Sequence, residues 1–191
     1  MRRTLMVLTA VLTVLVSAAA PASAQTRPRG IADRLMLQPE DLGGSVPGPV
    51  EDGLTWPLLP QPCADAPVPR PVASRTQAGD LGTRLRVYEN VARYRGAGGA
   101  RAYIDELKAQ LARCGVGGDQ EGFDPVAEDH MGPDMVLFLG TYDEGDRYVG
   151  YFAAAAGCYV VVVMMSDSLY GAADLTTLNG LGSAAMARAA S

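Results

Sequence analysis

The chain has 191 residues and a formal net charge of −5, from 16 lysine and arginine residues against 21 aspartate and glutamate residues. An acidic chain without a basic cluster is not expected to bind nucleic acid or an anionic membrane surface through charge. Its length fits one ordinary domain, which can bury a core without heavy disulfide cross-linking.

The N-terminal residues have the pattern of a cleavable secretory signal peptide. Arg2 and Arg3 give a positive start, residues 5–16 form an apolar run, and Ala22-Ser23-Ala24 is a small-residue cleavage motif. We therefore expect residues 1–24 to be removed and the protein to be secreted, with no membrane anchor. An uncleaved anchor is the alternative, but its apolar run is shorter than the ~20 residues that span a bilayer.

A tail is expected over residues 25–34, which are polar and contain proline and glycine, followed by one globular domain over residues 35–191. The domain begins with a short helical turn at residues 35–44, where Pro39 suits a first helical position. Residues 45–73 are rich in proline, which excludes a regular helix or a central strand. We expect this Pro-rich segment to lie extended over the domain.

Regular structure is expected after the Pro-rich segment. Alternation of apolar and polar residues or apolar runs predict strands over 72–77, 85–94, 123–128, 135–142, 147–155 and 159–165. Apolar residues at helical spacing predict helices over 100–113 and 172–190. This order predicts an α+β domain with an antiparallel or mixed sheet of about five to six strands and two main helices packed on one face.

The sequence shows no catalytic constellation, and we expect no catalytic residue, metal or cofactor. His130 is the single histidine, and its polar neighbours predict a solvated loop. Carboxylates crowd the turn at residues 143–146 and a second segment over residues 121–134. A calcium site or a glycosidase pair is the alternative to simple acidic turns. One histidine and three dispersed cysteines do not provide the ligand spacing of a zinc site.

Aromatic residues supply the candidate ligand-binding positions. On alternating strands such residues are commonly core edges or cross-strand pairs, and the alternative is that they line a groove. The candidates for the groove are Trp56, Tyr88, Tyr94, Tyr142 and Tyr151.

Three cysteines, Cys63, Cys114 and Cys158, remain in the mature chain. In an oxidising compartment one pair is the default and leaves one thiol over. The spacing alone leaves all three pairings open.

Several segments together resemble a known family. A segment over residues 37–43 leads into the Pro-rich stretch with Trp56 and Pro62-Cys63, then a strand ending at residues 89–94 and a helix ending at residues 111–114. This arrangement resembles the secreted and lipid-anchored actinobacterial sensor-domain proteins, which are related to the extracellular domain of PknH-type Ser/Thr kinases. The resemblance covers most of residues 35–190.

The resemblance implies a mixed or antiparallel sheet, helices on one side and a groove proposed to bind a ligand. It also implies that Cys63 pairs with Cys114, which leaves Cys158 as a free thiol that departs from the family pattern. We expect Cys158 to be buried or shielded; an intermolecular bridge is the alternative. With neither a kinase domain nor an anchor expected, a free-standing role in ligand binding or at the envelope is favoured over signalling.

Three functions follow from these observations. The first is a secreted, non-enzymatic ligand-binding or sensing module of the cell envelope or exterior, and its partner is an unknown small ligand or envelope protein. The second is a small secreted hydrolase that uses carboxylates. The third is an envelope protein–protein interaction domain. A groove would favour the first, two facing carboxylates with raised pKa values the second, and a flat apolar patch the third.

Overall fold

The computed structural model describes residues 30–50, 60–63, 65–115, 122–142, 147–167 and 174–191. The expected signal peptide, the acidic turn at residues 143–146 and Trp56 lie outside the described residues. The elements in chain order are η1 (Asp33–Leu35), β1 (Gly48–Pro49), β2 (Ala73–Leu81), β3 (Leu85–Arg93), α1 (Ala97–Cys114), β4 (Gly122–Glu128), β5 (Met135–Tyr142), β6 (Arg147–Ala156), β7 (Tyr159–Asp167) and α2 (Leu175–Ala189).

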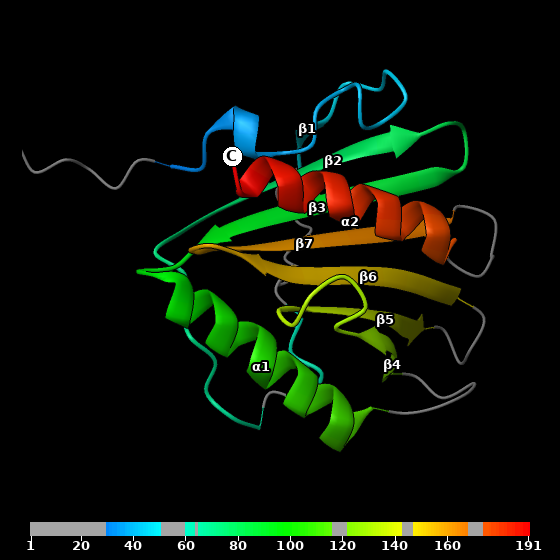
Figure 1. Ribbon diagram of the computed structural model, residues 1–191. Coiled ribbons are helices and arrows are strands. Elements are labelled where there is room, and N and C mark those ends of the chain that lie inside the picture. The colour runs from blue at the N-terminus through cyan, green and yellow to red at the C-terminus, as the bar shows by residue number, and fades with distance from the viewer. Residues whose placement is uncertain (1–29, 51–59, 64, 116–121, 143–146, 168–173) are drawn as a thin grey trace, which may run out of the picture.

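The described strands form one seven-stranded antiparallel sheet in the order β1-β2-β3-β7-β6-β5-β4 (Figure 1). A hairpin of β2 and β3 comes first, and a meander of β4 to β7 returns so that β7 pairs with β3. The predicted α+β class is therefore confirmed. The seventh strand is β1, a two-residue edge strand inside the Pro-rich segment, where the prolines argue only against a regular helix or a central strand.

Strand β7 lies at the centre of the sheet and is buried on both faces. Its register with β6 pairs Val161 with Ala154 and Val163 with Phe152, which places these four side chains on one face. The intervening valines of β7 point to the opposite face. Apolar runs of this kind are typical of strands covered on both sides.

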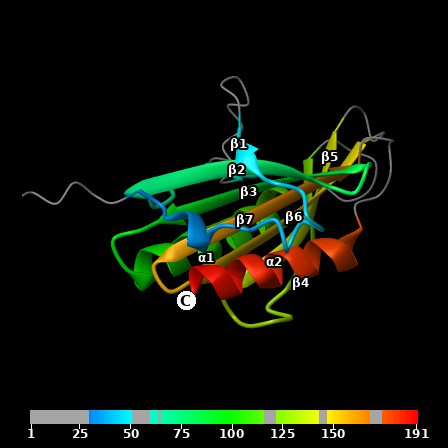
Figure 2. The same ribbon diagram turned by 90° about the horizontal axis from the view of Figure 1, so that it is seen from above.

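The first face is covered by α2 and by the N-terminal segment. The Asp174 side chain caps α2 by accepting the backbone N–H groups of Thr176 and Thr177. Figure 2 shows η1 and α2 next to each other on the same side of the sheet. Ile31, inside the segment expected as a tail, is buried in this core, so packed structure begins before residue 35. The apolar stripe of α2 consists of Leu178, Leu181, Ala185 and Ala189.

The opposite face is covered by α1 and by part of the Pro-rich segment. Both helices contact β6 and β7, yet their apolar residues belong to two separate cores on the two sides of these strands. The prediction that both helices pack on one face of the sheet was therefore wrong, because α1 and α2 lie on opposite faces. The reason is β7 itself, whose doubly apolar strand requires cover on each side. The α1 residues in this core are Ala100, Tyr103, Ile104, Leu107 and Leu111.

No helix within the described residues is both long enough and apolar enough to cross a membrane.

Two glycines of α2 provide a matched test of the packing between α2 and β6. A Cβ at Gly182 would lie 2.3 Å from Cγ of the buried Phe152 ring, whereas a Cβ at the exposed Gly180 would meet nothing within 4 Å. We expect Gly182→Ala to lower the free energy of unfolding by about 1–3 kcal/mol, as overpacking does. Gly180→Ala should raise it by about 0.5–1 kcal/mol, because alanine is the better helix former. Urea denaturation of both variants measures the difference; equal changes would contradict the packing.

Candidate functional site

One disulfide and two hydrogen bonds join residues 60–63 of the Pro-rich segment to α1. Cys63 and Cys114 form a disulfide with a Cα–Cα distance of 5.7 Å, the pairing that the family resemblance implied. The buried Tyr103 hydroxyl donates to the carbonyl of Pro60 at 2.9 Å. The backbone N–H of Cys63 donates to Oε1 of the buried Gln110 at 3.4 Å. The Pro-rich segment is therefore fixed along one side of the helix.

A further ion pair joins the same segment to the last turn of α1. Nε and Nη2 of Arg113 donate to the two carboxylate oxygens of Asp65 at 3.1 and 2.8 Å, and Nη2 also reaches Glu106 at 2.9 Å. The hydrogen bonds from Arg113 lower the pKa of Asp65. Asp65 is thus held as a carboxylate whose charge is already compensated.

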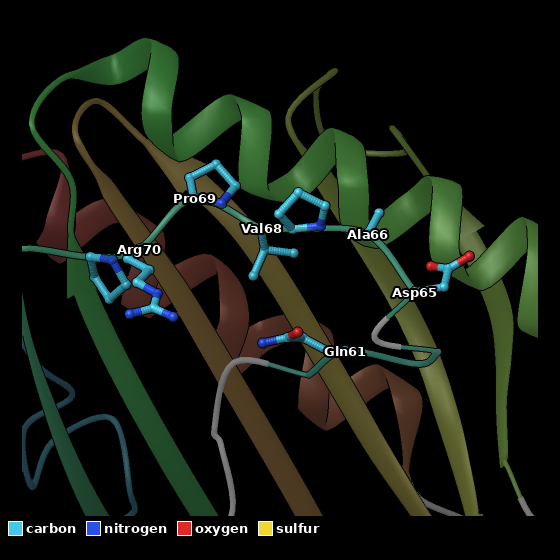
Figure 3. Close-up of a pocket in the computed structure, with 8 residues that line it drawn as sticks. Gln61, Asp65, Ala66, Val68, Pro69 and Arg70 are labelled. Atoms are coloured by element: carbon cyan, nitrogen blue, oxygen red, sulfur yellow. The ribbon is translucent and has the colours of Figure 1, made fainter.

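Beyond these attachments the Pro-rich segment lines a half-open cavity of about 430 Å³ (Figure 3). This volume lies in the range of small-molecule sites. In Figure 3 the segment runs beside α1 in front of the strands, with α2 behind the sheet. The lining residues are Gln61, Asp65, Ala66, Pro67, Val68, Pro69, Arg70 and Pro71. We call this space the Pro-rich cavity.

The polar side chains of the Pro-rich cavity differ in direction. Gln61 and Arg70 extend toward one another across the space, while Asp65 turns toward α1 (Figure 3). Val68 packs against the core under α1, so this part of the segment is seated on the sheet. The cavity therefore combines an apolar base with an amide and a guanidinium that face each other.

Three of the tyrosines predicted to line a groove, Tyr88, Tyr94 and Tyr151, lie on the α1 face. Tyr151 stacks on Phe138 with ring centroids 4.8 Å apart, and Tyr94 lies 6.2 Å from Tyr103. Tyr88 is half-buried beside this core. None of them is among the described residues that line the Pro-rich cavity. Tyr142 ends β5, and its side chain, like Trp56, lies outside the description.

Within the described part of the chain, two buried polar atoms on the α1 face lack a hydrogen-bond partner. Asn90 is 5% exposed and donates from Nδ2 to Thr76 at 2.8 Å, but its Oδ1 has no partner. Tyr94 is 3% exposed, and its hydroxyl also has none. Leaving such groups unpaired costs about 1–3 kcal/mol each. The α1 face therefore retains unused hydrogen-bonding capacity close to β3.

The other face holds a buried carboxylate that the sequence analysis did not single out. Glu89 is 1% exposed and accepts on Oε2 from the backbone N–H of Leu37 and from Nε2 of Gln77, both at 2.8 Å. The same Gln77 nitrogen donates to the Leu37 carbonyl at 2.8 Å. Burial raises the pKa of Glu89 to about 7, and the charge of Asp41 adds to the rise. Glu89 and Gln77 clamp the N-terminal segment to the sheet.

The remaining sequence candidates form no second site within the described part of the chain. His130 Nε2 lies 2.8 Å from Oδ1 of Asn179 in an exposed setting. Cys158, the free thiol, is half-buried at the turn between β6 and β7. Cys63, Asp65 and Cys114 bring three potential metal ligands together, but the disulfide removes both thiolates.

Comparison with known proteins finds a solved structure with a similar fold. No family model matches the sequence, and no curated protein matches it. Among solved structures, the extracellular domain of PknH from Mycobacterium tuberculosis is similar with a TM-score of 0.51 and 15% identity, over 85% of this chain and 96% of that chain. This likeness confirms the PknH-like fold that the sequence resemblance implied. At this identity it establishes the fold alone.

Removal of the disulfide tests how firmly the Pro-rich segment is anchored. The bridge spans 51 residues, and loop-closure entropy for that length predicts a loss of ~4 kcal/mol in the double variant Cys63→Ser/Cys114→Ser. Denaturation with and without reductant measures this. Reductant should destabilise the wild type and the control Cys158→Ser, and leave the double variant unchanged. A double variant as stable as the oxidised wild type would show that the bridge does not anchor the segment.

The raised pKa of Glu89 predicts a pH dependence of stability. Between the ordinary value of 4.5 and about 7 the folded state holds a proton that the unfolded state has lost. The contribution of Glu89 to the free energy of unfolding is therefore fully present below pH 4.5. It falls by about 1.4 kcal/mol per pH unit as the pH rises to about 7. Glu89→Gln should remove this slope while the nearby Asp41 and Arg188 stay. Urea titrations from pH 4.5 to 7.5 with the same slope in both proteins would refute the assignment.

Proposed function

We propose that this chain is a secreted, non-enzymatic binding or sensing module that takes a small ligand in the Pro-rich cavity. The proposed organisation is a signal peptide over residues 1–24 followed by a single domain. The observation that carries the proposal is the cavity itself, an opening of ligand size held beside α1 by a disulfide, a buried hydroxyl and an ion pair.

Secretion is supported by two independent features. The N-terminal residues have the signal-peptide pattern, and disulfides such as Cys63–Cys114 persist in oxidising compartments outside the cytoplasm. The similar solved structure is itself an extracellular domain, from an actinobacterium. These points favour an exported actinobacterial protein.

The composition of the cavity supports binding without a large ordering cost. Pro67, Pro69 and Pro71 alternate along its wall, and each proline fixes its own φ angle. A wall that is already restricted in the free protein loses less entropy when a ligand binds. The segment is therefore suited to keep the cavity open before a ligand arrives.

The two other functions have less support among the described residues. The cavity contains one carboxylate, Asp65, and Arg113 already compensates it, so no pair of carboxylates faces across this space. Large exposed apolar side chains include Val46, which is 79% exposed, and Val126. Val46 precedes β1 and Val126 lies in β4, at opposite edges of the sheet, so they do not form one flat patch.

Export is tested by expressing the 191-residue chain in an actinobacterial host and measuring the mass of the protein in the culture medium by mass spectrometry. We expect the mass of a chain that begins at Gln25 and carries one disulfide. A protein retained in the cells with its N-terminal residues intact would contradict secretion.

Ligand binding is tested by a fragment screen with protein-observed NMR. Fragments that bind should shift the amide signals of Ala66, Val68 and Arg70. The variant Ala66→Trp fills the cavity and should abolish these shifts. Thr83→Trp, at the exposed turn between β2 and β3, is the matched control and should leave them unchanged. Shifts that persist in Ala66→Trp would place binding elsewhere.

A further inference from the structure

The charged groups of the Pro-rich cavity are unequally paired. Two of its lining side chains carry charge, Asp65 and Arg70. Asp65 receives two hydrogen bonds from Arg113 and turns toward α1. Arg70 has no ion-pair or hydrogen-bond partner among the described residues, and a guanidinium stays protonated at any physiological pH. The uncompensated charge in the cavity is therefore positive, although the whole chain carries −5.

The hydrogen-bond donors of the cavity are concentrated in the same place. Pro67, Pro69 and Pro71 have no backbone N–H, so every second residue of this wall offers no main-chain donor. The side-chain amide of Gln61 and the guanidinium of Arg70 supply donors from opposite sides and extend toward one another (Figure 3). Two sets of N–H donors that face each other across a gap match an oxyanion placed between them.

Arg70 and Gln61 are both exposed, so a ligand can reach them directly from solvent. The prolines on both sides of Arg70 and the side chain of Val68 supply apolar surface next to the guanidinium. The planar guanidinium also fits the geometry of a carboxylate or a phosphate better than an ammonium does.

We propose that the Pro-rich cavity selects a small anionic ligand, whose carboxylate or phosphate group binds between Arg70 and Gln61. This inference rests on the proposed function, because it specifies the ligand class for the same cavity. The apolar part of such a ligand lies against the prolines and Val68. A neutral ligand of the same shape leaves the guanidinium without its anion and binds more weakly.

The test compares benzoate with benzamide, which has the same shape without the charge, and adds inorganic phosphate as the second oxyanion. Each is titrated into the oxidised mature protein at low salt, and NMR follows the side-chain N–H signals of Gln61 and Arg70. We expect benzoate to bind at least ~10-fold more tightly than benzamide, as a charge-assisted hydrogen bond implies. The ratio should fall as salt is raised. The tighter of benzoate and phosphate identifies the carboxylate or the phosphate as the source of the anion.

Three variants separate the role of Arg70 from a general charge effect. Arg70→Ala should make the affinities for benzoate and benzamide equal, and Arg70→Lys should restore part of the difference. Arg95→Ala removes an exposed arginine outside the cavity lining and should keep the full ratio. Equal affinities for benzoate and benzamide in the wild type would overturn the anion preference and leave the binding module intact. Binding of no probe and no fragment in the cavity would overturn the proposed function as well.

Discussion

The architecture depends on one constraint: the central strand β7 has to be kept from water on both faces. Its valines alternate between two cores, so each face of the sheet needs a cover. With about 25 cal/mol gained per Å² of apolar surface buried, one bare face would forfeit much of the stability of a domain this size. Helix α2 with the N-terminal segment covers one face, and α1 with the Pro-rich segment covers the other.

The two covers are built differently, and this difference places the candidate site. On the α2 face, the N-terminal segment is bonded directly to the sheet by Glu89 and Gln77, and Arg188 of α2 adds an ion pair to Asp41. On the α1 face, the Pro-rich segment is bonded to the helix through Cys63. Val68 seats part of this segment on the core, while the prolines around it restrict the chain and leave the cavity along its lining.

Much of the fold could be predicted from the sequence, because periodicity reports local structure. Six strands and both helices lie where alternation and helical spacing placed them, with ends moved by a few residues. The apolar run of β7 already indicated cover on both faces, and the expectation of helices on one face ignored that signal. Strict alternation along β3 puts Glu89 on the same face as Val87 and Val91, although charged residues are seldom buried. The cavity gave no sequence signal, since it depends on how an irregular segment is held against α1.

The most direct test of this account is a crystal structure of the mature protein soaked with benzoate. We predict an intact Cys63–Cys114 bridge, a Pro-rich segment beside α1 with its cavity open, and the benzoate carboxylate between Gln61 and Arg70. A Pro-rich segment that leaves no space between these two side chains would contradict this prediction.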